Sequence, residues 1–208
     1  MIDFLKRASR PFLFVTLLLI PSFLFAQLRF VLVNDGVMPE KEMEKIEEMG
    51  NELYEKTKVP VFVAVVADLN ETKPIDLIKR VENQYPTYIL LYFSLKPSAV
   101  NIFASDDAKQ MIDIEQILSP LPWRGTIRPV MSPAFSKSES VKQEVAIFNG
   151  YADIVDQVAE SRGVKLTTSV GSQSKTSFQI VRTIFYAILA FVILQFILVA
   201  RKQRAQRR

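Results

Sequence analysis

The feature that most constrains this chain is a long apolar segment near its C-terminus. In residues 178–200 the polar interruptions are Gln179, Arg182, Thr183 and Gln195, and residues 183–200 carry no charge. A helix needs about 20 apolar residues to cross a hydrocarbon core roughly 30 Å thick. A helix on the surface of a soluble domain would show a polar face, which this segment lacks. We therefore predict a transmembrane helix over residues 178–200.

A basic tail, residues 201–208, follows this segment. Its positive charges are Arg201, Lys202, Arg204, Arg207 and Arg208. Basic residues beside a membrane span stay on the cytoplasmic side, so we predict a cytoplasmic tail and a preceding domain across the membrane. The same charges are expected to attract anionic lipid headgroups.

The N-terminus carries a second membrane signal. Lys6, Arg7 and Arg10 precede the apolar run 11–26, which ends on the small residue Ala26 before polar Gln27. This order is typical of a secretory signal peptide over residues 1–26. Two outcomes stay open, cleavage after Ala26 or retention as an uncleaved anchor. Both place the middle of the chain outside the cytoplasm, which for a bacterial-type inner membrane is the periplasm.

The charge of the middle differs from that of the whole chain. The net charge of the chain is +4, but the tail contributes +5 and residues 1–26 contribute +2, which leaves −3 for the rest. The exported part is therefore mildly acidic, and we expect no nucleic acid as a partner.

The chain contains no Cys and no His. This composition excludes thiolate nucleophiles, disulfides, imidazole bases and the usual zinc ligands. Any catalysis would have to use carboxylates, Ser, Tyr or Lys, so whether the protein is an enzyme stays open and a binding role is favoured.

The middle of the chain is predicted to alternate between strands and helices. Runs of β-branched and aromatic residues predict strands over 29–33, 59–67, 87–95 and 99–104, the last as an antiparallel hairpin return. Apolar periodicity predicts helices beginning at Pro39, at Pro74, at Asp106 or Asp107, and at Ser140, the last closed by Gly163. The run 59–67 is apolar on both faces, as in a central strand covered by helices.

The expected fold class is α/β. We expect a three-layer α/β/α sandwich with a mixed, mostly parallel central sheet over residues 27–163, plus the C-terminal transmembrane helix. Residues 119–137, which contain four prolines, are expected to be an irregular connection. Residues 164–177 are rich in Ser, Thr and Gly and are expected to be a flexible tether.

Several short motifs of this segment are similar to those of a known family. They are Val33-Asn34-Asp35 at a strand end, the strands Val61–Val66 and Tyr88–Phe93, the stretch Ile127–Phe135, and Ala146–Gly150 in the last helix. Together with the order of signal, domain, tether and span, they resemble the TPM domain family of membrane-anchored α/β domains, over about residues 29–163. The family usually has an Asn-Gly before its third strand and a Gly-rich stretch after its hairpin strand, and this chain has neither.

The resemblance implies two kinds of function. Some TPM domains act as accessory or repair factors for membrane protein complexes, and others are described as weak acid phosphatases or calcium binders. Glycines at these places would let the backbone approach a phosphate closely. Their absence from this chain counts against the phosphatase role. We expect a non-catalytic accessory domain that supports the assembly, stability or repair of a membrane protein complex, with a divalent-cation-dependent, acid-phosphatase-like hydrolase as the alternative.

The candidate metal ligands are acidic residues that follow strands. Asp35, Asp106 and Asp107 are the predicted set for a cation such as Ca²⁺, with Asp68 on the same edge as Asp35 if the first two strands are parallel. An antiparallel hairpin return would instead move Asp106 and Asp107 to the opposite edge. As an alternative, these residues serve only as turn residues and helix caps.

The candidate partner-binding residues are Trp123 and Arg124 in the proline-rich connection. Trp and Arg are enriched among residues that dominate binding interfaces. The alternative is that Trp123 covers the core beneath a long loop.

Overall fold

The structure is a computed structural model that describes residues 28–70, 72–134 and 136–169, together with residues 188, 189, 191 and 195. The predicted signal peptide and the basic tail lie outside the described residues, and so does most of the predicted span at 178–200. Within the described residues, no helix is both long enough and apolar enough to cross a membrane.

The described residues form a mixed α/β fold around one four-stranded sheet. Its strands are β1 (Val31–Asn34), β2 (Val61–Asp68), β3 (Ile89–Lys96) and β4 (Ala99–Ala104), in the order β1-β2-β3-β4. β1 pairs with β2 and β2 with β3 in parallel, whereas β4 returns antiparallel to β3. The mixed, mostly parallel sheet and the antiparallel hairpin confirm the sequence prediction.

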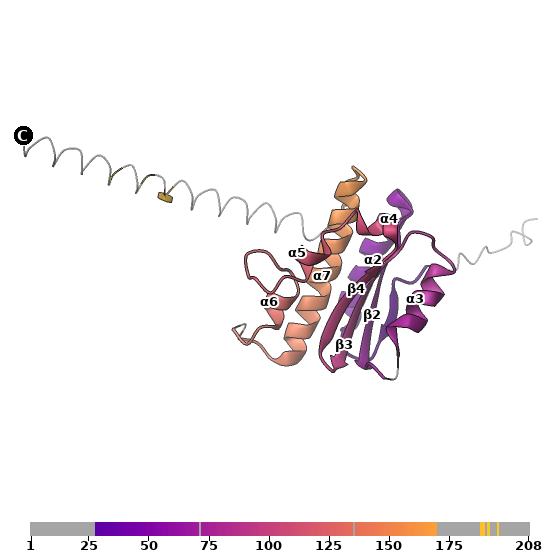
Figure 1. Cartoon of the computed structure of the whole chain (residues 1–208), viewed down its shortest axis with the longest axis horizontal. Coiled ribbons are helices and arrows are strands. Elements are labelled where there is room, and N and C mark those ends of the chain that lie inside the picture. The colour runs from indigo at the N-terminus through magenta and orange to yellow at the C-terminus, as the bar shows by residue number, and fades with distance from the viewer. Residues whose placement is uncertain are drawn as a thin grey trace, which may run out of the picture.

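Helices lie on both faces of this sheet (Figure 1). The helices are α2 (Glu40–Thr57), α3 (Pro74–Glu82), α4 (Asp106–Lys109), α5 (Ile114–Ile117), α6 (Arg128–Met131) and α7 (Glu139–Ser161). Figure 1 shows α3 on one side of the strands and α7 on the other. α2 packs beside α7, and the short helices α5 and α6 also pack against α7.

Alternation along β2 explains why both faces are covered. Val61, Val63 and Val65 belong to the apolar cluster shared with α2 and α7, whereas alternate residues of the same strand belong to the cluster shared with α3. Successive side chains of a strand point to opposite faces. An uninterrupted apolar run therefore makes both faces apolar, and both must be covered by helices.

One predicted helix differs from the observed structure. The single helix expected after Asp106 or Asp107 is two four-residue helices, α4 and α5, because the Asp113 side chain accepts a hydrogen bond from Gln116 N at 2.8 Å and starts a second helix. Ser105, not an Asp, precedes α4. In α3 the buried residues are Leu77 and Val81, while Ile75 is 49% exposed.

Residues 164–169 are also different from the prediction. The first part of the expected flexible tether packs against the domain: Val164 N donates to Ala159 O at 2.9 Å, and Val164 and Leu166 contact the apolar cluster beneath α2 and α7. Polar contacts of the segment reach Glu52 and Lys56 of α2 and Asp156 of α7. We name residues 164–169 the C-terminal clasp, since they join the two helices.

The clasp is held mainly by one carboxylate. Glu52 accepts hydrogen bonds from the backbone N–H groups of Thr167 and Thr168, at 2.8 Å and 2.9 Å, and from both Thr hydroxyls, at 2.9 Å and 2.6 Å. Lys56 Nζ donates to Glu52 at 2.7 Å and also to the carbonyl oxygen of Lys165 at 2.7 Å. The side chain of Glu52 is only 14% exposed. Its burial raises the pKa, but the hydrogen bonds from Lys56, Thr168 and Thr167 outweigh burial and hold the pKa well below its usual range.

Glu52→Gln should therefore weaken the clasp. An amide lacks the charge that these donors surround, so we expect a loss of about 1–3 kcal/mol in the free energy of unfolding at pH 7, measured by urea denaturation. Because the pKa of Glu52 is lower in the folded than in the unfolded chain, the stabilisation is full above about pH 4.3 and declines as the pH falls below that value. The difference in the free energy of unfolding between the wild type and Glu52→Gln should therefore become smaller as the pH falls. Glu55→Gln, at an exposed position of the same helix, is the matched control.

Candidate partner-binding site

The carboxyl edge of the parallel strands holds Asp35 and Asp68, as predicted. Asp35 follows β1, and Asp68 ends β2 opposite Lys96 of β3. Asp35 is committed to the backbone: its N–H donates to Val65 O at 3.1 Å, and its carboxylate accepts from Ala67 N at 2.7 Å. Burial, together with the negative charges of Asp35 and Asp68, raises the pKa of Tyr92. Asp35 therefore acts here as a residue that joins two strand ends.

Asp106 and Asp107 do not join this edge, which corrects the predicted cation site. Since β4 runs antiparallel to β3, it ends opposite Ile89, where β3 begins, and Ser105 N donates to Tyr88 O at 3.1 Å. The residues after β4 therefore lie at the opposite end of the strands from Asp35. Asp106 instead pairs with Lys109 at 2.8 Å on an open surface, and this hydrogen bond lowers the pKa of Asp106. Within the described ranges no three acidic residues are grouped to hold a metal ion.

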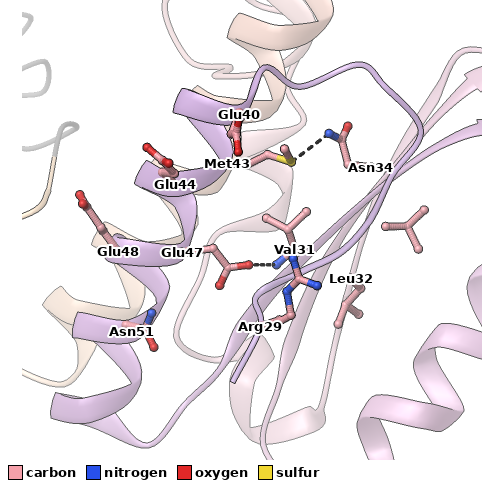
Figure 2. Close-up of a pocket in the computed structure, with 11 residues that line it drawn as sticks. Arg29, Val31, Leu32, Asn34, Glu40, Met43, Glu44, Glu47, Glu48 and Asn51 are labelled. Carbon is pink, nitrogen blue, oxygen red and sulfur yellow. Dashed lines mark hydrogen bonds between the residues drawn. The ribbon is translucent and has the colours of Figure 1, made fainter. Parts of the chain in front are cut away.

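A groove lies between α2 and β1 (Figure 2). Figure 2 shows Glu47 pointing from α2 to β1, while Glu44 and Glu48 point away from the strand. Glu47 accepts from Phe30 N at 2.9 Å and from Val31 N at 3.0 Å. The groove thus contains one carboxylate already used by the backbone, and its other acidic groups do not converge.

Trp123 is the most exposed large apolar side chain in the described domain, at 74%. It lies in the connection between α5 and α6, beside Leu121, which is 40% exposed. Arg124 is next to it, with its guanidinium 3.9 Å from the Asp113 carboxylate. The structure therefore places both predicted partner-binding residues on the surface, and the alternative that Trp123 covers the core is wrong.

The loop that carries Trp123 is held by its own backbone. The carbonyl oxygen of Leu121 accepts from Arg124 N at 3.0 Å and from Gly125 N at 2.7 Å. A Cβ atom at Gly125 would overlap the carbonyl oxygen of Ser119, so this turn requires glycine. The loop is consequently a defined turn with an apolar tip. Gly125 was not singled out from the sequence, because a single glycine in a proline-rich stretch predicts only a turn.

A polar network beneath the loop fastens it to α7. Asp153 of α7 is only 6% exposed, and it accepts hydrogen bonds from Thr126, Gln116 and Gln157. Gln116 also donates to the carbonyl oxygen of Arg124 at 2.8 Å. Buried polar groups that satisfy each other fix one arrangement, because breaking any pair leaves a desolvated group without its partner. The residues of this network are far apart in sequence, and no local motif reveals them.

Comparisons with known proteins add little to this geometry. No protein-family model and no curated protein matches the chain. Among solved structures, it resembles the NMR structure of the BA42 protein from the psychrophilic bacterium Bizionia argentinensis, with a TM-score of 0.42 and 10% sequence identity. The match covers 64% of this chain and 93% of that one. A likeness of this degree carries no functional argument.

Gly125→Ala should loosen the loop. The added methyl group overlaps the Ser119 carbonyl, so the turn must open and the network at Asp153 must shift. We expect a lower melting temperature and a lower fluorescence anisotropy of Trp123, which is the single tryptophan of the chain. Gly36→Ala adds a Cβ that meets nothing within 4 Å but strains a backbone with φ of +76°, so it should lower the melting temperature and leave the anisotropy of Trp123 unchanged. An unchanged anisotropy in Gly125→Ala would contradict a rigid loop.

Proposed function

We propose that this protein is a membrane-anchored accessory protein whose exported domain binds a membrane protein complex and supports its assembly, stability or repair. The observation that carries the proposal is the exposure of Trp123 on a loop fixed from below by Asp153. A rigid aromatic residue loses little conformational entropy on binding, and Trp and Arg are the residues most enriched at the centres of interfaces.

The proposed architecture joins this domain to the membrane. It is a TPM-like three-layer α/β/α sandwich with a cleaved or retained N-terminal signal at 1–26, a transmembrane helix at 178–200 and a cytoplasmic tail at 201–208. The domain lies in the periplasm of a bacterial-type inner membrane, and the tail contacts anionic lipid headgroups.

The C-terminal clasp makes a membrane-bound partner the natural choice. The clasp contacts the domain as far as Ser169, which leaves eight residues before the apolar segment begins at Phe178. Eight residues span at most about 28 Å when fully extended. The domain is thereby confined to a layer beside the membrane, where it meets proteins that are themselves embedded there.

The alternative function considered from the sequence was a cation-dependent phosphatase. The positions of the predicted metal ligands do not support it. Asp35 lies at the opposite end of the strands from Asp106 and Asp107, so one ion cannot contact all three. We include no cofactor and no Ca²⁺ in the proposal.

Trp123→Ala should abolish binding to the partner without unfolding the domain. We expect the stability to change by less than about 0.5 kcal/mol, since the side chain is mostly in solvent. The test is cross-linking and affinity purification of the tagged full chain from native membranes, followed by identification of stoichiometric partners. Arg124→Ala should weaken the same recovery. Ile75→Ala, at another exposed apolar residue on α3, is the matched control and should keep the partner. Equal recovery with Trp123→Ala would reject this loop as the binding site.

The topology has its own test. A reporter that works only in the cytoplasm should be active when it is fused after Arg208. Protease added to the outside of intact spheroplasts should cleave the domain. A reporter that is active only outside the cytoplasm would refute the proposed orientation.

A further inference from the structure

The two edges of the sheet are treated differently by the chain. β1 is one outer strand and β4 is the other. At β1, the Glu47 carboxylate occupies the N–H groups of Phe30 and Val31, with Oε2 at 2.9 Å and Oε1 at 3.0 Å. A charged side chain bound along an edge prevents another strand from pairing there. The edge at β1 is therefore protected by a specific contact.

The edge at β4 has no such protection. The strand Ala99–Ala104 contains no charged residue and no proline. Throughout the ranges that the structure describes, the hydrogen bonds of β4 go to β3, and no other segment bonds to its outer side. Natural proteins usually blunt an open edge with Lys, Pro, a bulge or a covering segment. An open edge of this kind is suited to pairing with another strand.

The ladder between β3 and β4 shows which backbone groups face outward. Ser105 N donates to Tyr88 O, so these two residues form a hydrogen-bonded pair. Hydrogen-bonded pairs alternate along an antiparallel ladder, which turns the N–H and C=O groups of every second residue away from β3. From the register, the residues that face outward are Val100, Ile102 and Ala104.

We propose that β4 pairs antiparallel with β4 of a second copy of this chain, around a two-fold axis that passes between the two Ile102 residues. In this register each Ile102 faces the other, and Val100 faces Ala104 of the second copy. All three outward N–H groups and all three outward C=O groups of each strand find partners. The result is a continuous eight-stranded sheet made of two four-stranded ones.

Side chains and charges both fit a second copy. On the α2 and α7 face, the pairing places Ile102 against Ile102 and Val100 against Ala104, all apolar. At the ends of the strand the charges are opposite: Lys96 precedes the turn into β4, and Asp107 follows β4 together with Asp106, which pairs with Lys109 and leaves a net negative charge at that end. Antiparallel pairing brings the start of one strand to the end of the other, so Lys96 of each copy lies at the same end as the Asp pair of the other. Isologous two-fold contacts of this kind are the commonest way in which soluble domains associate.

The first experiment is a charge introduced into the edge. Asn101 is exposed and lies between the outward-facing residues, so Asn101→Lys should leave the monomer folded. Two such lysines lie about 7–8 Å apart diagonally across the proposed pairing, and we expect the dimer dissociation constant to rise by about tenfold or more. The measurement is sedimentation equilibrium of the full chain in detergent micelles. Asn101→Thr, uncharged and suited to a strand, should associate like the wild type.

The second experiment uses the absence of cysteine from the chain. Asn101→Cys, treated with a short bismaleimide, should give a cross-linked dimer through the single added thiol. Glu48→Cys, exposed on α2 near the protected edge, should give far less. A wild-type chain that is monomeric at every concentration overturns the proposal. So does a dimer that persists unchanged in Asn101→Lys, because association would then lie outside β4. Both outcomes are independent of whether Trp123 binds a partner.

Discussion

The fold depends on the burial of β2 and β3 on both faces. Six consecutive residues of each strand are buried, so each strand needs apolar helices on either side. α2 and α7 supply one cover and α3 the other. Tyr151 of α7 is wholly buried and still hydrogen-bonds to the carbonyl oxygen of Val61 at 2.9 Å, which fixes the height of α7 over the sheet. The loop with Trp123 and the C-terminal clasp are both positioned by contacts with these helices.

Much of this framework was predictable from sequence because it depends on periodicity. Continuous apolar runs identified the central strands, and three- to four-residue spacing identified the helix after Pro39, which the structure shows as α2. The errors occurred where one specific side-chain contact outweighs a pattern. Asp113 divides a predicted helix because its side chain caps a new turn, and residues 164–169 are fixed by Glu52, which lies more than 100 residues earlier. The contact with Glu52 lies outside any short sequence window, whereas the Asp113 cap is local and was hidden by the apolar spacing that predicted one longer helix.

The candidate sites show the same limit. The sequence placed Trp123 in a proline-rich loop and left open whether it is exposed or covers the core, and the rigidity of that loop depends on Asp153 and Thr126, which lie 27 residues apart in sequence. The predicted cation site failed for a topological reason: the direction of one strand, β4, decides whether Asp106 lies beside Asp35 or at the far end of the sheet. The antiparallel return was itself the expected direction of this strand, and it counted against the cation site that the acidic residues alone suggested.

The C-terminal clasp has a mechanical consequence. Tension applied through the proposed membrane anchor would first act on Ser169, Thr168 and Thr167, whose contacts reach Asp156 and Glu52 on two different helices. The force is thereby distributed over α2 and α7, and it does not act on the last turn of α7 alone. Under the proposed anchoring, contacts to two helices make the domain more resistant to unfolding from its C-terminal end than a contact to α7 alone would.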